Sequence, residues 1–187
     1  MVLNLIQTQG KYGENKVYVS TIPTPIGEML VLETKRGICL LEFLDRKGLE
    51  HGVQVVLEKG KGQLREGGNN FFALLSEELE VYFRECTSPF SVPLDMMGTE
   101  FQKQVWNSLI EIPVGQTRTY SQVAETIGKS KAVRAVGNAN AKNPIAIVIP
   151  CHRLIGANGT LTGYGGGIWR KEWLLKREKQ AGKSDRK

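Results

Sequence analysis

The sequence predicts an α/β (α+β) fold in two parts: a small N-terminal domain with an antiparallel sheet and a helix, and a mostly helical C-terminal domain with a helix-turn-helix. Apolar and polar residues alternate with the period of strands over residues 16–44. From residue 70 onward, apolar residues recur with the period of helices. A change in composition falls at residues 93–98. We therefore expect domains over residues 1–92 and 93–187.

Short strands separated by turns account for the predicted N-terminal sheet. Each strand is a run of β-branched and large apolar side chains, and these runs cover residues 16–19, 28–32 and 37–44. The Gly- and charge-rich residues 59–69 are typical of a loop. A helix is predicted to follow over residues 70–83, where large apolar residues form one stripe.

Two capping boxes mark helix starts in the C-terminal half. Thr99 and Thr119 are each followed three residues later by a glutamine, which is the spacing for reciprocal capping. They predict helices over residues 100–110 and 120–127. A third helix is expected over residues 132–140, after a Gly-containing turn. Two short helices joined in this way indicate a helix-turn-helix.

Basic charge is concentrated in the C-terminal half. Residues 1–98 hold 10 Lys and Arg against 13 Asp and Glu, whereas residues 99–187 hold 15 against 6. A concentrated positive field favours a polyanionic partner, because each phosphate contact releases counterions. No apolar run is long enough to span a membrane, and residues 1–11 lack the pattern of a signal peptide. We expect a nucleic-acid partner and no membrane partner.

The cysteines predict neither a disulfide framework nor a metal site. There are three, Cys39, Cys86 and Cys151, with no Cys-x-x-Cys pair, and only two histidines accompany them. Cys39 lies in a predicted strand and is interpreted as a buried apolar side chain. We therefore expect a reduced, intracellular protein, cytoplasmic or nuclear, with no metal and no cofactor.

Cys151 stands in the segment of greatest chemical interest. The apolar run 145–149 predicts a buried strand, and it leads directly to Pro150-Cys151-His152-Arg153. By itself a Cys-His dipeptide is more typical of a structural cysteine beside a surface histidine. The positive charge of Arg153 would, however, lower the pKa of the thiol, and the thiolate is the nucleophilic form.

His152 is the candidate base for this thiol. Neighbouring side chains of an extended segment point in opposite directions, so we expect a water molecule to bridge His152 and Cys151. A carboxylate would then fix the tautomer of the imidazole. The final helix, predicted over residues 168–179, offers Glu172 and Glu178 as candidates.

The order of motifs around Cys151 resembles the active-site region of the O6-alkylguanine-DNA alkyltransferases. The resemblance is strong over residues 89–179 and loose over residues 17–86. The matching residues near the cysteine are Asn143-Pro144, Ile149-Pro150-Cys151-His152-Arg153, Gly163-Tyr164, Gly166-Gly167, Lys171, Leu174-Leu175 and Glu178. Upstream they are Gly98-Thr99, Phe101-Gln102, Val105-Trp106, Ile112-Pro113, Gly115, Thr117, Thr119-Tyr120 and Arg134-Ala135-Val136-Gly137-Asn138-Ala139.

This resemblance implies direct-reversal repair of double-stranded DNA that contains alkylated guanine. An alkyl group would pass irreversibly from O6-alkylguanine, and from O4-alkylthymine, to Cys151 after the nucleotide is flipped out of the duplex. One protein molecule would accept one group, and a monomer is expected. The implied folds are ribonuclease-H-like for the N-terminal domain and winged-helix-like for the C-terminal domain.

The resemblance also implies roles for the residues around Cys151. His152 would be the base, acting through water, and Glu178 rather than Glu172 would orient it. Asn143 would order the active-site loops. Tyr120 would contact the flipped guanine and assist proton delivery to its departing O6.

Further residues are expected to contact the DNA or to line the substrate pocket. Arg134 would enter the base stack and fill the gap left by the flipped nucleotide, and small residues beside it would let the helix approach the minor groove. The expected DNA-binding residues are Arg134, Ala132, Ala135, Gly137, Thr119 and Ser121. The expected pocket residues are Tyr164, Gly165 and Leu154. Some relatives have a serine at the position of Gly165, and some bind an N-terminal zinc whose ligands this chain lacks.

Three other functions compete with this interpretation. A non-catalytic alkyltransferase-like protein would bind lesions without accepting the alkyl group, but such proteins replace the cysteine that is present here. A cysteine hydrolase would leave the helix-turn-helix unexplained. A transcription regulator would read the major groove with polar side chains, whereas residues 132–140 are mostly small and apolar.

Overall fold

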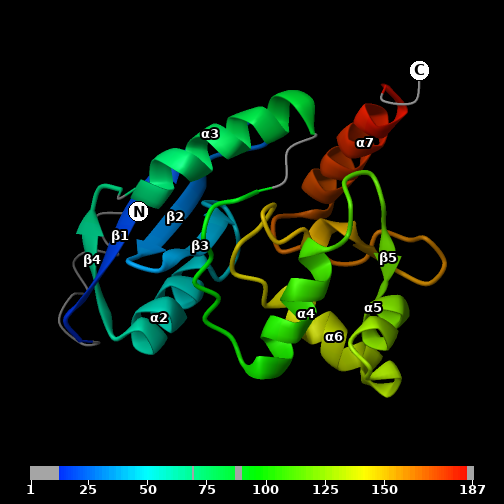
Figure 1. Cartoon of the computed structure of the whole chain (residues 1–187), viewed down its shortest axis with the longest axis horizontal. Coiled ribbons are helices and arrows are strands. Elements are labelled where there is room, and N and C mark those ends of the chain that lie inside the picture. Colours follow the sequence, from blue (N-terminus) through cyan, green and yellow to red (C-terminus); the bar gives the residue numbers. More distant parts are fainter. Residues whose placement is uncertain (1–12, 69, 87–89, 185–187) are drawn as a thin grey trace. The chain divides into compact units, whose positions relative to one another are not determined.

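The computed structural model describes residues 13–68, 70–86 and 90–184 of the chain. The described residues form two compact units (Figure 1). Unit 1 contains the described residues up to Phe83 together with residues 90–97, and unit 2 contains residues 84–86 and everything from Gly98 onward. The predicted mixed α/β fold class is confirmed. None of the described helices has the length and apolar character needed to cross a membrane.

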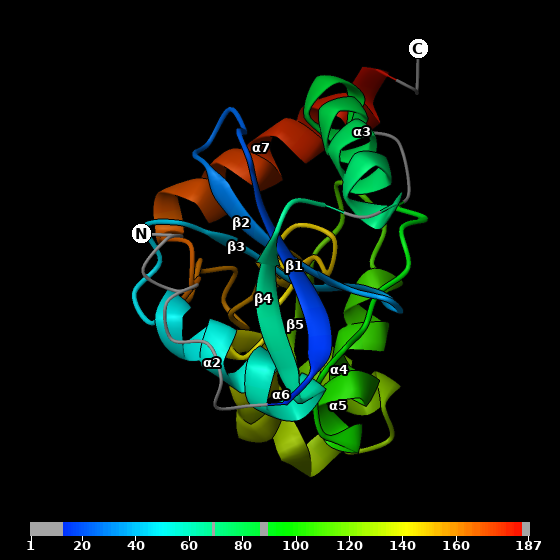
Figure 2. The same ribbon diagram turned by 90° about the vertical axis from the view of Figure 1, so that its left-hand side faces the viewer.

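Unit 1 is built on a four-stranded sheet with the strand order β3-β2-β1-β4. The strands β1 and β2 and the strands β2 and β3 pair antiparallel, whereas β1 and β4 pair parallel. Figure 2 shows β1 and β4 side by side at the edge of this sheet. The bounds are β1 (Asn15–Ile22), β2 (Met29–Thr34), β3 (Gly37–Phe43), α2 (Leu49–Gly60), β4 (Gly62–Glu66) and α3 (Asn70–Glu85).

Both faces of β2 and β3 are buried, and a helix covers each side of the sheet. One face packs against α2 in a single apolar cluster that includes Val19, Leu32, Val53 and Leu64. The other face holds Glu33, whose carboxylate accepts a hydrogen bond from the first turn of α3. Figure 1 shows α3 along the side of the sheet opposite α2. This two-sided cover explains why β2 and β3 are buried at every position.

The sequence analysis of this unit missed two elements, β4 and α2. The sheet is mixed rather than antiparallel, because the residues expected to form a loop contain β4, which pairs with β1. The helix α2 was not predicted at all. Residues 93–97 lie in unit 1 rather than in the C-terminal domain, because the carbonyl of Pro93 and the amide of Asp95 both bond Ile38 of β3, at 2.8 Å each.

Unit 2 is mostly helical, as the sequence predicts. Both capping boxes are present, since Thr99 and Thr119 each cap a helix and exchange hydrogen bonds with the glutamine three residues later. The helices α4 and α6 are joined at their centre by Trp106, whose indole donates to the carbonyl of Ala139 at 2.9 Å. The bounds are α4 (Glu100–Ile110), β5 (Arg118–Thr119), α5 (Tyr120–Thr126), η1 (Ser130–Ala132), α6 (Val133–Ala141), η2 (Cys151–Arg153), β6 (Leu154–Ile155) and α7 (Ile168–Ser184).

The apolar run before Cys151 is buried but is not a strand, so this prediction is wrong. Residues 145–149 turn back on themselves, with the amide of Ile149 donating to the carbonyl of Ile145 at 3.0 Å. Ile147 has a positive φ of 70°. Because these backbone groups bond within the run, no neighbouring strand is needed to satisfy them.

Candidate active site

The candidate nucleophile, Cys151, begins a short 3-10 helix rather than ending a strand. Its amide donates to the carbonyl of Ile149 at 2.7 Å, and the amide of Arg153 donates to the carbonyl of Pro150 at 2.9 Å. The side chain is 7% exposed. The expectation of an extended segment with opposed side chains is therefore wrong, because the backbone turns at the cysteine.

Asn143 holds the turn that precedes the cysteine. Its Nδ2 donates to the carbonyl of Ile149 at 2.8 Å, and its Oδ1 accepts from the amide of Ile145 at 3.0 Å. Asn143 is itself buried. One side chain therefore bonds both ends of the apolar run, which is the geometry expected of a residue that orders this loop.

Behind the cysteine lies a buried cluster of three charged or titratable side chains. The Nε2 atom of His152 lies 2.9 Å from Oε1 of Glu178. Arg153 binds the same carboxylate with two nitrogens, Nε at 3.0 Å from Oε2 and Nη2 at 2.8 Å from Oε1. Its remaining Nη1 donates to the carbonyl of Ile112 at 2.6 Å. Two-point binding of this kind fixes the orientation of the carboxylate as well as its charge.

Glu178 is the carboxylate that meets the histidine, and Glu172 is not. Glu178 is fully buried in α7, whereas Glu172 is exposed. The backbone amide of Gly115 donates to Oε2 of Glu178 at 3.2 Å. The carboxylate therefore has partners from the loop after α4 and from η2, and these bonds explain how an ionised group is tolerated in a buried position.

The electrostatics of the cluster favour a neutral imidazole beside an ionised carboxylate. Burial lowers the pKa of His152 below its ordinary value of 6.5, and the charges of Arg153 and Lys171 add to this although the hydrogen bond to Glu178 opposes it. Burial alone would raise the pKa of Glu178. The hydrogen bonds and charges of His152 and Arg153 outweigh that effect and hold it well below its ordinary value of 4.5.

The ionised carboxylate determines the tautomer of His152. A carboxylate can only accept, so Nε2 must carry the proton that it donates to Glu178. The other ring nitrogen, Nδ1, is then the unprotonated, basic one. Nδ1 is buried, and no described residue forms a hydrogen bond with it. The imidazole is thus oriented to take up a proton at Nδ1.

Lys171 is a residue of this site to which sequence reasoning assigned no role. It is fully buried, and its Nζ donates to the carbonyls of Leu154 and of Thr162, the latter at 2.8 Å. Burial lowers the pKa of Lys171 to about 8, and an electrostatic interaction with Cys151 opposes this shift. Lys171 is therefore a cation that interacts with Cys151, whereas Arg153, which the sequence suggested for this role, is held on Glu178.

A signal for Lys171 was present in the sequence. Lys171, Leu174 and Glu178 are spaced three and four residues apart on the final helix, so they share one face. Leu174 is buried in the structure, and so are both charged residues. A lysine and a glutamate in line with a core leucine indicate buried charges with specific partners.

Tyr120 is placed next to the cysteine segment by a small parallel pairing. Arg118 and Thr119 of β5 pair with Leu154 and Ile155 of β6, directly after η2. Tyr120 is the first residue of α5, so its position follows from this pairing. Its hydroxyl lies 3.0 Å from Oγ1 of Thr162, a residue that sequence reasoning missed.

The expected pocket residues differ in their exposure. Leu154 is fully buried, Tyr164 is half-buried, and Gly165 is exposed. The ring of Tyr164 lies edge-on to that of His152, with centroids 6.5 Å apart and planes at 85°. Tyr164 belongs to the loop before α7, so this loop contributes a ring next to the histidine.

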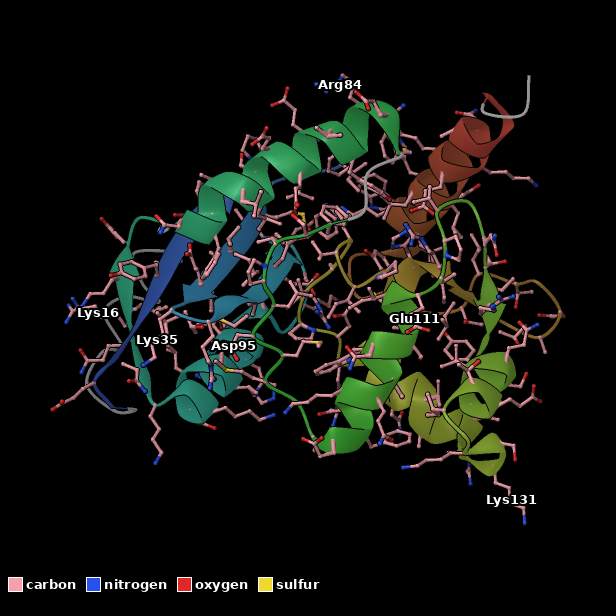
Figure 3. The ribbon with its side chains drawn as sticks, in the orientation of Figure 1. Lys16, Lys35, Arg84, Asp95, Glu111 and Lys131 are labelled. Carbon is pink, nitrogen blue, oxygen red and sulfur yellow. The ribbon has the colours of Figure 1, made fainter. Side chains whose placement is uncertain are left out.

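The expected DNA-binding residues lie around the start of α5, in η1 and along α6. Arg134 and Ala135 are exposed. The other four, Ala132, Gly137, Thr119 and Ser121, are half-buried. Nearby, Lys131 of η1 points away from the protein surface (Figure 3). The expected residues at the start of α5 also serve the capping of that helix, since the hydroxyl of Thr119 accepts from the amide of Gln122 and lies 2.9 Å from the hydroxyl of Ser121.

A metal site is not indicated in the part of the chain that the structure describes. No group of three or more His, Cys, Asp or Glu side chains there is arranged to hold a metal ion. Cys39 and Cys86, the other two cysteines, are buried and form no disulfide. Burial raises the pKa of Cys39, so this thiol remains protonated.

Two family profiles match the chain, one for each part of the fold. Residues 17–96 match a profile described as the ribonuclease-like domain of 6-O-methylguanine DNA methyltransferase. Residues 100–180 match a profile described as the DNA binding domain of 6-O-methylguanine DNA methyltransferase. The fold and the site thus correspond to a class of proteins in which a ribonuclease-like domain is followed by a DNA-binding domain.

Curated relatives carry the same family name. The methylated-DNA–protein-cysteine methyltransferase of Methanosarcina acetivorans is 44% identical over 87% of this chain and 98% of its own length. The protein of that name from Mycobacterium leprae is 41% identical over 87% of this chain and 93% of its own length. The chain therefore belongs to the 6-O-methylguanine DNA methyltransferase family, and the resemblance inferred from its sequence is confirmed.

Solved structures share the fold. The chain matches Mycobacterium tuberculosis OGT in complex with DNA with a TM-score of 0.75 and 41% identity, over 88% of this chain and 94% of the other. It also matches the O6-methylguanine-DNA methyltransferase of the archaeon Pyrococcus kodakaraensis strain KOD1 with a TM-score of 0.62, over 87% of this chain and 98% of the other. At 24% identity, the archaeal match supports the fold alone.

Proposed function

We propose that this protein repairs double-stranded DNA by transferring an alkyl group from O6-alkylguanine to Cys151. O4-alkylthymine is a second proposed substrate, since it presents the same kind of alkylated oxygen. The protein acts as a monomer inside the cell, where the DNA lies, and each molecule accepts one group. The family assignment and the neighbour solved in complex with DNA support a DNA substrate.

The observation that carries the proposal is the hydrogen bond between His152 and Glu178 directly behind Cys151. It leaves Nδ1 of His152 as a base in a buried site that holds a cysteine. A general base and an adjacent thiol are the two groups needed to generate a thiolate at neutral pH. The cation of Lys171 stabilises that thiolate further.

The proposed transfer is a single displacement. The thiol proton of Cys151 passes through a water molecule to Nδ1 of His152. The sulfur then attacks the alkyl carbon, a carbon–sulfur bond forms, and the bond between that carbon and O6 breaks with its electrons on the guanine. Tyr120 gives the departing base a proton. The product is a thioether, and no described group near Cys151 is suited to cleave it, so the protein is consumed.

A guanine inside a duplex cannot reach a buried thiol, so the proposal requires the nucleotide to be flipped out. Unstacking costs a few kcal/mol, and a side chain that fills the gap offsets part of this cost. Arg134 is exposed near the start of α6 and has the length to do so. Asn143 keeps the turn that carries Cys151 in place while the base enters.

Mass spectrometry of the protein after incubation with a duplex containing one O6-methylguanine tests the proposal. We expect one methyl group on the peptide that contains Cys151, at no more than one per protein molecule. The peptides of Cys39 and Cys86 are internal controls and should stay unmodified, because both thiols are buried and burial raises the pKa of each.

Two results would contradict the proposal. Methylation of Cys39 or Cys86 with Cys151 unchanged would show that the nucleophile is assigned wrongly. Tight binding of the damaged duplex without any transfer would instead favour a non-catalytic lesion-binding protein. A Cys151→Ser variant provides the matched control, because it should bind the duplex and accept no methyl group.

A further inference from the structure

A buried ammonium group, that of Lys171, bonds the loop between β6 and α7. Nζ of Lys171 donates to the carbonyls of Leu154, just before this loop, and of Thr162, within it. A buried ammonium is costly unless its protons are bonded, so these two carbonyls stabilise the lysine as much as the lysine stabilises the loop. The backbone of Thr162 is therefore fixed.

The side chain of Thr162 extends this anchoring to Tyr120. Its Oγ1 lies 3.0 Å from the phenol oxygen of Tyr120, and the two residues come from different parts of unit 2. The ring of Tyr120 packs alongside Gly137 of α6, where an added Cβ would lie 3.8 Å from the ring. Gly137 thus accommodates the ring, while Thr162 is the described residue that bonds its hydroxyl.

We propose that Thr162, anchored by Lys171, is a positioning residue that orients the phenol hydroxyl of Tyr120 for proton delivery to the departing guanine. This inference rests on the proposed function. Either hydroxyl can be the donor of this hydrogen bond. In the proposed arrangement Thr162 donates to the phenol oxygen, which leaves the phenol proton directed at the base. As that proton leaves, negative charge develops on the phenol oxygen, and the threonine hydroxyl stabilises it.

The site offers a matched set of variants for this inference. Thr162→Val removes the hydroxyl and keeps the shape, and Thr162→Ser keeps the hydroxyl. Thr160→Val removes a hydroxyl from the same loop, and that hydroxyl bonds only Asn158 among the described residues. Tyr120→Phe removes the phenol oxygen itself. None of these changes touches the buried cluster of His152 and Glu178.

Single-turnover transfer from a duplex containing O6-methylguanine, measured over a range of DNA concentrations, separates binding from chemistry. Thr162→Val should lower the saturating rate about fivefold, as the loss of one net hydrogen bond in the transition state predicts, without changing the half-saturating concentration. Thr162→Ser should restore the rate, and Thr160→Val should match the wild type. A purely structural role for Thr162 would not confine the effect to the saturating rate, nor would it make that rate depend on the hydroxyl of residue 162.

A double variant makes the test specific. If Thr162 acts through the phenol, Tyr120→Phe combined with Thr162→Val should be as slow as Tyr120→Phe alone. A wild-type rate for Thr162→Val, or effects of the two changes that multiply, would overturn the inference. Inactivity of the wild type on the same duplex would refute the proposed function itself, and an active wild type with an unimpaired Thr162→Val would refute only the role of Thr162.

Discussion

The basicity of His152 depends on a single side chain on α7. Glu178 accepts the Nε2 proton of the imidazole and so leaves Nδ1 as the base. Glu178 is in turn held by Arg153 and by the amide of Gly115. Each contact of the site therefore depends on the next. Removing the charge of one residue should affect residues that it does not contact.

Glu178→Gln should slow methyl transfer about a hundredfold, because a neutral amide neither stabilises the imidazolium that forms nor pairs with Arg153. Single-turnover rates on duplex DNA containing O6-methylguanine measure this, at a temperature where circular dichroism shows the variant folded. Glu172→Gln is the matched control on the same helix, and its rate should equal that of the wild type. Equal rates for both variants would remove the orienting role of Glu178.

Residue types and spacing predicted some of the site and not the rest. Cys151, His152, Asn143 and Glu178 lie together as the resemblance implied. The pairing of Arg153 with Glu178 was not predicted, because the resemblance assigned this carboxylate to His152 alone and the residue types suggested that Arg153 acts on the thiol. Sequence gives no direct measure of the distances between side chains.

Among the secondary-structure elements, the pair α5 and α6 presents the surface proposed for DNA. The capping box of α5 fixes its start at Tyr120, and α6 begins after the short helix η1 with Arg134 exposed in its first turn. Arg134 and Tyr120 thus each lie in the first turn of a helix, and a capping box and the pairing of β5 with β6 hold the start of α5.

Arg134→Ala should slow transfer from duplex DNA roughly tenfold or more, because the gap left by the flipped nucleotide is then unfilled. Transfer from free O6-methylguanine base needs no flipping and should be unchanged. Comparing the two substrates by methylation of Cys151 measures the difference. Lys142→Ala, which removes an exposed charge at the other end of α6, should leave the ratio as in the wild type. Equal losses on both substrates for Arg134→Ala would mean that this side chain does not assist flipping.

Elements with strong local signals were predicted well, and those that depend on partners were not. The two capping boxes located α4 and α5 because their signal lies within four residues. The apolar run 145–149 has no such signal, and burial alone is equally compatible with a strand or a turn. The side chain of Asn143 decides in favour of the turn. The strand β4 depends on pairing with β1, which lies far away in the sequence.

For the whole molecule, the buried cluster links stability to pH. In the folded protein the pKa of His152 lies below 6.5 and that of Glu178 lies below 4.5, whereas the unfolded chain has the ordinary values. As pH falls through 6.5, the unfolded chain takes up a proton on the imidazole that the folded protein does not. As pH falls through 4.5, it takes up another on the carboxylate. The unfolded state binds more protons in both windows, so acid lowers stability.

The midpoint of thermal unfolding should therefore fall by roughly 5 °C or more between pH 7 and pH 5, and further below pH 4.5. Tryptophan fluorescence reports on the relevant unit, because all three tryptophans, Trp106, Trp169 and Trp173, lie in unit 2. In a His152→Gln variant the loss between pH 7 and pH 5 should shrink. A wild-type midpoint that stays constant or rises over that range would contradict the linkage.

Gly115 belongs to the site although it has no side chain that could take part in the chemistry. It is exposed in a loop, yet its amide binds Glu178, its φ of 76° suits glycine, and an added Cβ would come within 3.0 Å of the carbonyl of Glu178. A side chain there would push the loop away from the carboxylate. Among natural variants of this chain, a change at Gly115 would resemble a harmless surface polymorphism, and its carriers would accumulate mutations while every recognisable catalytic residue stayed intact.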